Sequence, residues 1–154
     1  MKLWWPAILS LLPLAFVCGC ANRGDTQPGY LEMRLAREDP AEGFTRASVQ
    51  NTNEKIYVSP SVAVNEKDVK SADIVRMQQG PAVALTFTWW GSRRLAKFTK
   101  AHIGDRIVIL VDGRAILAPG INSPITDGRM LIDGHFTEEQ ASSLVKAINQ
   151  RTGR

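Results

Sequence analysis

The sequence predicts an α+β domain in which a mostly antiparallel sheet carries two helices packed on one face. Three observations predict this class. An apolar run, Ile107 to Val111, is followed by Asp112-Gly113 and a second apolar run, which is the pattern of a β-hairpin. Residues 82–88 alternate between apolar and polar or small side chains, as strands with one buried face do. Two further segments have helical periodicity and begin after a threonine.

The hairpin from Arg106 to Pro119 is expected to form the centre of the sheet. Its first strand is unbroken and mostly β-branched, which suits a strand covered on both faces. Burial of five large side chains would contribute about 1.5–3 kcal/mol each, comparable in sum with the net stability of a small domain. Asp112 and Gly113 tolerate the positive φ of a type I′ turn, and Pro119 lacks the N–H that a continuing strand needs.

The other strands are expected to be short. Residues 37–53 read as a long loop with a short element near 44–49, and Ser59-Pro60 is expected to stop the strand that begins at Lys55. One turn of helix is expected within 65–70. The strand segments lie at residues 30–35, 55–58, 73–77, 82–88, 115–118 and 129–133.

Both helices have threonine caps. Thr88 caps a helix that runs to about Ala101 and ends before Gly104. Thr137 and Gln140 have the spacing of a capping box at the start of the last helix. The apolar positions that are expected to face the sheet are Leu95, Phe98 and His102 in the first helix and Ala141, Leu144, Val145 and Ile148 in the second.

The amino-terminal segment predicts export. Lys2 precedes an apolar run at residues 3–17 that two prolines interrupt, and this pattern is typical of a signal peptide. A membrane-spanning helix needs about 20 apolar residues. We therefore expect residues 1–19 to be a signal peptide.

Cys20 is the predicted lipidation site. Val17-Cys18-Gly19-Cys20 resembles the lipobox of bacterial lipoproteins, and Cys20 fits better than Cys18 because a glycine precedes it. An ordinary signal peptide with incidental cysteines is the alternative. Residues 20–29 are polar and read as a flexible tether, and residues 30–154 are expected to form the domain. Ala21, in place of an acidic residue, favours the outer over the inner membrane.

Composition and motifs argue against several functions. The sequence has only two cysteines, so a mature chain starting at Cys20 must fold by core packing alone. The net charge of +4 is scattered, which does not favour nucleic acid as a partner. His102 is expected to be a core or capping residue, and His135 has no visible catalytic partners. We expect no enzymatic activity, no metal and no cofactor or small-molecule substrate.

Trp89 and Trp90 are the candidate polypeptide-binding residues. They stand where a strand becomes a helix, so both cannot easily point inward. In one interpretation, one tryptophan packs in the core and the other covers its edge. In the other, the two form an exposed aromatic patch that holds apolar segments of an extended partner.

A set of turn, cap and core residues stands in a fixed order along the second half of the chain: Leu85, Thr86, Phe87, Gly91, Phe98, Thr99, Gly104, Arg106, Asp112, Gly113, Ala118, Pro119, Ile121, Pro124, Ile125, Gly128, Ile132, Gly134, Phe136 and Thr137. Their joint order and spacing resemble the head part of the first periplasmic domain of SecD, a family of accessory subunits of the bacterial Sec export channel. The similarity is strong over residues 80–149 and weaker over 55–73. Trp89-Trp90 and His135 depart from it, because smaller or more polar residues are expected there.

The resemblance implies an α+β head that contacts exported chains on the periplasmic side. SecD proteins also have membrane-spanning helices with ionisable residues, which suit proton-coupled work, and this sequence has none. We therefore expect a lipid-anchored, non-enzymatic domain that binds polypeptide or a component of the export or envelope machinery. The alternative is a structural or inhibitory envelope lipoprotein with the same fold and no role in secretion.

Overall fold

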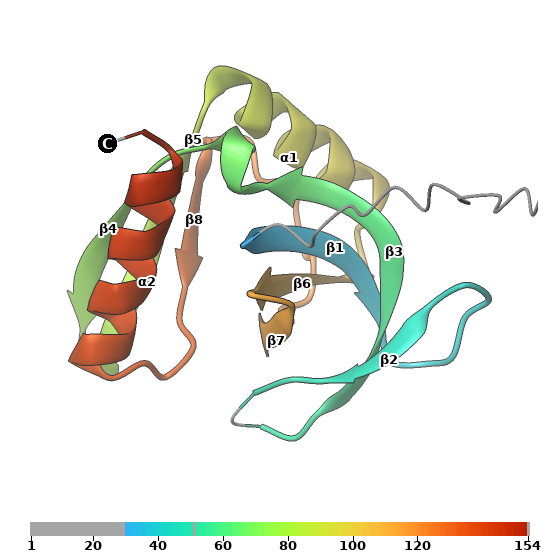
Figure 1. Ribbon diagram of the computed structural model, residues 1–154. Coiled ribbons are helices and arrows are strands. Elements are labelled where there is room, and N and C mark those ends of the chain that lie inside the picture. Colours follow the sequence, from blue (N-terminus) through green and yellow to red (C-terminus); the bar gives the residue numbers. More distant parts are fainter. Residues whose placement is uncertain (1–29, 51, 154) are drawn as a thin grey trace, which may run out of the picture.

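The strands form two antiparallel sheets, and two helices pack against them (Figure 1). The computed structural model describes residues 30–50 and 52–153. The five-stranded sheet has the order β2-β3-β1-β6-β7, and the three-stranded sheet has the order β4-β5-β8. The elements are β1 (Leu31–Arg37), β2 (Thr45–Ser48), β3 (Lys55–Asn65), the 3-10 turn η1 (Glu66–Asp68), β4 (Val69–Met77), β5 (Gly80–Phe87), α1 (Trp89–Ala101), β6 (Arg106–Val111), β7 (Arg114–Leu117), β8 (Arg129–Ile132) and α2 (Glu138–Arg151).

The main core lies where the two sheets and the two helices meet. Strands β1 and β6 contribute Met33 and Ile109 from one sheet, and β5 contributes Leu85 from the other; all three are fully buried. Leu95 of α1 and Ile148 of α2 join the same cluster. The α+β class, the antiparallel pairing and the two packed helices are therefore confirmed.

Strand β6 is covered on both faces, as its apolar run predicts. Ile107 and Ile109 point into the main core, whereas Val108 packs in a second, smaller cluster with Ala36 and Ala115. The alternation of side chains along a strand places these two sets on opposite faces.

The hairpin of β6 and β7 is present, but its predicted position at the centre of the sheet is wrong. Asp112 and Gly113 have φ of 50° and 73°, which confirms the two positive-φ turn residues. However, β1 is the middle strand of the five, and β7 lies at an edge. Strand β1 pairs with β3 on one side and with β6 on the other. Its short alternation of apolar and polar residues did not indicate that it lies in the middle of the sheet.

The predicted stop at Ser59-Pro60 is also wrong, because β3 continues to Asn65. The pairing of β1 with β3 shifts register between Arg34 and Ala36, so Pro60 lies at a bulge where its missing N–H leaves no ladder bond broken. The Arg34 guanidinium donates to the Pro60 carbonyl at 3.1 Å across this bulge.

The helix boundaries follow their caps. The Thr88 hydroxyl accepts a hydrogen bond from Gly91 N at 3.0 Å, and Thr137 and Gln140 form the predicted capping box. Helix α2 packs on β4 and β5, while α1 contacts β3, β5 and η1. Within the described part of the chain, no helix is long and apolar enough to cross a membrane. The predicted signal peptide, the tether and Cys20 lie outside the described residues.

Candidate functional site

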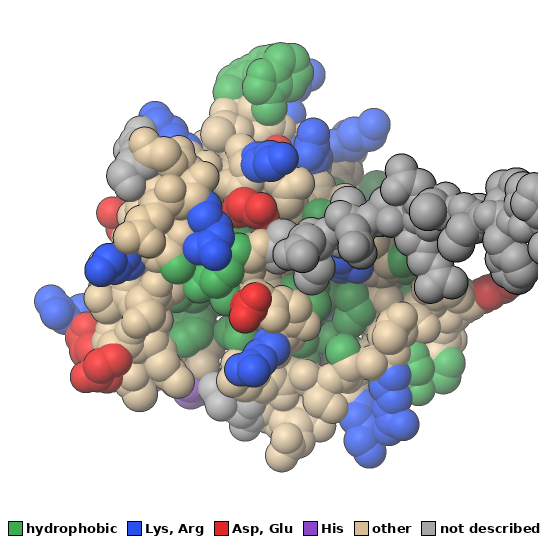
Figure 2. Space-filling model, viewed as in Figure 1, with side chains coloured by type: hydrophobic (Ala, Val, Ile, Leu, Met, Phe, Trp, Pro, Cys, Tyr) green, Lys and Arg blue, Asp and Glu red, His purple; other side chains and the backbone are tan. Residues whose placement is uncertain are grey.

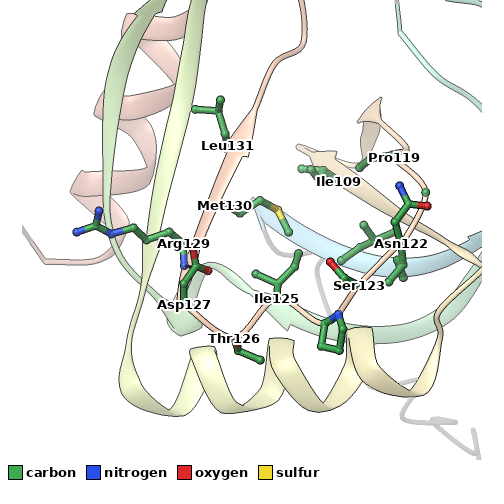
Figure 3. Close-up of a pocket in the computed structure, with 14 residues that line it drawn as sticks. Ile109, Pro119, Asn122, Ser123, Ile125, Thr126, Asp127, Arg129, Met130 and Leu131 are labelled. Atoms are coloured by element: carbon green, nitrogen blue, oxygen red, sulfur yellow. Dashed lines mark hydrogen bonds between the residues drawn. The ribbon is translucent and has the colours of Figure 1, made fainter.

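An open cavity of about 610 Å³ lies between the two sheets (Figure 3). Strand β6 forms one wall and β8 the other. The segment that joins β7 to β8, residues 119–128, closes its base above α1. The cavity is therefore built from elements of both sheets.

Hydrogen bonds fix the 119–128 segment at both ends. Ile107 N donates to the Pro119 carbonyl at 3.0 Å, and Ile121 N donates to the Asp105 carbonyl at 2.8 Å. Farther along, Ile125 N donates to the Thr99 hydroxyl of α1 at 2.9 Å. The cavity lining is thus hydrogen-bonded to α1 as well as to β6 and the residue before it.

The cavity has an apolar floor and a polar rim. Ile107, Ile109 and Ile121 are buried at its base. The half-buried side chains of Met130 and Ile125 point into the space, and Arg129 points away from it (Figure 3). The rim residues include Asn122, Ser123, Thr126 and Asp127. Asp127 and Arg129 are the charged residues of the lining, so the cavity has no strong charge preference.

Strand β8 exposes its outer backbone edge beside this cavity. Phe87 N donates to the Gly128 carbonyl at 2.9 Å, which makes Phe87 and Gly128 a hydrogen-bonded pair. In an antiparallel ladder such pairs alternate with non-bonded pairs. Leu131, opposite Ala84, is three residues farther along, so its N–H and C=O point away from β5. Strand β8 is an edge strand, and the Leu131 side chain is 44% exposed.

Trp89 and Trp90 are both exposed, at 61% and 71%. The interpretation in which one packs in the core is therefore wrong. Their rings contact each other edge to face with centroids 4.5 Å apart, and the Arg93 guanidinium lies 4.8 Å from the Trp89 ring centre. Figure 2 shows hydrophobic side chains projecting above the amino-terminal end of α1. The structure does not bring the two tryptophans into the cavity lining.

The two histidines lie apart from the cavity. His102 Nδ1 is 2.9 Å from the Phe98 carbonyl oxygen, and its ring stacks on Phe98, so it is a satisfied residue at the helix end as predicted. His135 is exposed with a φ of 53°. Among residues 30–50 and 52–153, no group of three or more His, Cys, Asp or Glu side chains could hold a metal ion.

Sequence reasoning missed the cavity. It predicted residues 120–128 as a loop and 129–133 as a strand, but periodicity does not reveal which strand edges stay unpaired. The composition of the 120–128 loop was a usable signal, because Ile121 and Ile125 interrupt an otherwise polar stretch. Both side chains pack against the main core.

The fold and the cavity define a small α+β domain with an open groove between two sheets. A family model described as "SecDF, P1 head subdomain" matches residues 42–151. The chain therefore belongs to the SecDF P1 head family, as the sequence resemblance predicted.

Relatives and solved structures agree with this family. The chain is 40% identical over 134 residues to protein translocase subunit SecD of Magnetococcus marinus, covering 82% of this chain and 25% of that protein. It is 31% identical over 141 residues to SecDF of Thermus thermophilus, with 79% and 19% covered. A structure titled "Structure and function of a membrane component SecDF that enhances protein export" superposes with a TM-score of 0.62 at 27% identity, covering 77% of this chain and 60% of that chain. The chain spans about a fifth to a quarter of the length of the two relatives.

Proposed function

We propose that this chain is a non-enzymatic domain that binds an extended segment of polypeptide, in the service of protein export, on the extracytoplasmic side of a membrane. The observation that carries the proposal is the outer edge of β8 along the inter-sheet cavity, which pairs with no other strand in the described part of the chain. The membership of a family whose relatives are translocase subunits supports the link to export.

The geometry suits the addition of a strand. An extended peptide beside β8 would exchange hydrogen bonds with the outward N–H and C=O of Leu131, which gives affinity without regard to sequence. Its alternate side chains would enter the apolar space between Met130 and Ile109. A near-neutral lining admits many sequences, as a domain that meets varied exported chains requires.

A proline at position 131 tests this directly. Leu131→Pro removes an N–H that faces away from β5, and proline is tolerated on an edge strand in that orientation. Loss of one hydrogen bond of about 0.5–1.5 kcal/mol should raise Kd for a labelled peptide of alternating valine and serine roughly threefold to tenfold. Leu131→Ala, the matched control, keeps the N–H and should weaken binding less.

The opposite ranking would overturn the strand-addition geometry. If Leu131→Pro binds as wild type and remains folded by circular dichroism, the peptide does not pair with β8. If wild type shows no saturable binding of the peptide, the cavity is not a polypeptide site. Trp89 and Trp90 remain a predicted polypeptide contact, and Trp89→Ser with Trp90→Ser in the same assay tests it.

The lipid anchor at Cys20 is a separate part of the proposal. Acyl chains on Cys20 would hold the domain on a membrane face and raise its local concentration there, with the outer membrane favoured by Ala21. Mass spectrometry of the chain from envelope fractions should show acyl groups on Cys20, and Cys20→Ser should release the protein from membranes. An unmodified Cys20 with residues 1–19 still attached would refute the anchor.

A structural or inhibitory envelope lipoprotein with the same fold is the alternative. Cross-linking from position 131 in envelope preparations separates the two functions. Cross-links to many unfolded chains or to Sec subunits support the export role. A cross-link to one folded partner supports the alternative.

A further inference from the structure

We propose that the outer face of α1 docks on an anionic lipid surface. This face consists of Trp89, Trp90, Arg93, Lys97 and Lys100, which project on the side of the helix opposite the buried Gly91, Leu95 and Thr99. All five outer residues are exposed. The inference rests on the proposed placement at a membrane, but it is independent of polypeptide binding at β8.

The charged residues of α1 all have the same sign. The helix carries four basic residues and no acidic residue over its length. Arg94 is engaged, because its guanidinium donates to the buried Asp68 carboxylate at 3.1 Å. Arg93, Lys97 and Lys100 form no ion pair with an acidic side chain in the described structure. Their charges are available to an anionic partner.

The helix macrodipole accounts for only part of this charge pattern, because Lys100 lies in the last turn, where a cation is favoured, whereas Arg93 and Lys97 do not. Acidic residues are favourable in the first turn of a helix, and α2 has Glu138 and Glu139 there. The first turn of α1 has none, and Arg93 follows it directly. Basic residues that the macrodipole does not favour, beside two indole rings exposed to water, point to a partner that contacts both.

Tryptophan beside basic residues matches the chemistry of a membrane surface. Indole rings partition to the level of the lipid headgroups, where an apolar body and a polar N–H are both accommodated. Lysine and arginine near an anionic surface are attracted to its phosphates. A shallow hollow lined by Trp90, Arg93, Arg94 and Lys97 places both chemistries on one surface.

The first residues of the domain lie close to the start of α1, which agrees with an orientation in which this end of the domain faces the membrane. Glu32, at the start of β1, pairs with Asn65, and Asn65 N donates to Asp68 Oδ2 at 3.1 Å. The Asp68 carbonyl in turn accepts from Thr88 N at 2.8 Å, immediately before Trp89. In Figure 1, η1 lies between the start of β1 and the start of α1. A flexible tether that joins the domain at Tyr30 would keep this end within reach of its membrane.

Tryptophan fluorescence of the full chain in vesicles provides the test. The sequence has four tryptophans, so Trp4→Phe and Trp5→Phe make Trp89 and Trp90 the only ones left. The chain is reconstituted in phosphatidylcholine vesicles with or without phosphatidylglycerol, with bromine on the acyl chains of the phosphatidylcholine. We expect bromine quenching in the phosphatidylglycerol vesicles and little in phosphatidylcholine alone.

A charge variant and its matched control complete the design. Each basic residue contributes about fivefold at an anionic surface, so Arg93→Gln, Lys97→Gln and Lys100→Gln together should lower the ratio of docked to undocked domain about 100-fold and abolish quenching. Arg46→Gln, Lys55→Gln and Arg114→Gln remove the same charge from exposed positions on β2, β3 and the start of β7 and should leave quenching unchanged. Raising the salt concentration should also reduce quenching in the parent chain.

Several outcomes would overturn the proposal. Equal quenching with and without phosphatidylglycerol, or an equal loss of quenching in both charge variants, would show that this face does not bind anionic lipid specifically. No quenching, with a fluorescence change on adding the valine-serine peptide instead, would assign Trp89 and Trp90 to polypeptide. Circular dichroism of every variant confirms that the fold is retained, and failure of peptide binding at β8 would not affect these results.

Discussion

Asp68 and Arg94 join η1 to the first turns of α1. The Arg94 guanidinium donates to the Asp68 carboxylate at 3.1 Å, and the carboxylate is buried while the arginine is more than half exposed. The backbone of Asp68 lies so close to α1 that a β-carbon on Gly91 would be 2.8 Å from the β-carbon of Asp68 and would collide with its carbonyl oxygen. This contact sets the direction in which α1 leaves β5.

Gly91→Ala should therefore destabilise the domain, although alanine is the better helix former. The intrinsic gain of at most about 1 kcal/mol is outweighed by the collision with Asp68, and we expect a net loss of about 1–3 kcal/mol in urea unfolding. Gly120→Ala is the control, because its β-carbon would meet its nearest atom, Asn122 Oδ1, at 4.0 Å. If both changes are neutral, η1 and α1 are not in close contact.

The turn of the β6–β7 hairpin gives a second prediction. Gly113 has a φ of 73°, where a β-branched side chain is strained, so Gly113→Val should cost at least about 1–2 kcal/mol. The melting temperature should fall by several degrees. Asp112→Asn keeps a residue type that tolerates positive φ and should melt as wild type does. An unchanged melting temperature for Gly113→Val would refute the turn geometry.

The sequence predicted local elements well because their determinants are local. Thr88 and Thr137 cap their helices, and Asp112-Gly113 turns the chain, through bonds and φ values that involve near neighbours. The order of strands depends instead on distant pairings. Ile107 to Ile109 are as buried as predicted, yet nothing in that run shows that β1 separates β6 from β3.

The candidate site was predicted less well for the same reason. Trp89 and Trp90 were singled out correctly as unusual, but only the packing of Gly91 and Leu95 shows that both point outward. The cavity needs residues from β6 and β8, which belong to different sheets. No spacing in the sequence brings these strands together.

A third prediction concerns the start of α2. The Glu139 carboxylate accepts hydrogen bonds from the backbone N–H of Glu139 and from the Thr137 hydroxyl. These bonds lower the pKa of Glu139 from its ordinary value of 4.5. Because the folded-state pKa is depressed, the stabilisation is present above the unfolded value and is lost as pH falls through the folded value. Carboxyl NMR titration should give a midpoint below 4.5 for Glu139 in the wild type.

Thr137→Ala should move that midpoint upward, toward 4.5, because one donor to Glu139 is removed. The same change removes the cap of α2 and should cost about 1 kcal/mol at neutral pH. Circular dichroism of Thr137→Ala should show that α2 keeps its helical content. A loss of helical signal would indicate that α2 unwinds, and the shift at Glu139 would then not report the lost hydrogen bond.

The last prediction links the core to the cavity through Thr99. This fully buried hydroxyl donates to the Leu95 carbonyl and accepts from Ile125 N, both at 2.9 Å. Thr99→Val keeps the volume but leaves the Ile125 N–H without its acceptor, which should cost about 1–3 kcal/mol. The released 119–128 segment should also raise Kd for the valine-serine peptide. Thr99→Ser keeps the hydroxyl and should retain peptide binding even where losing a methyl group lowers stability, whereas equal weakening by valine and serine would show that packing, and not this hydrogen bond, holds the cavity lining in place.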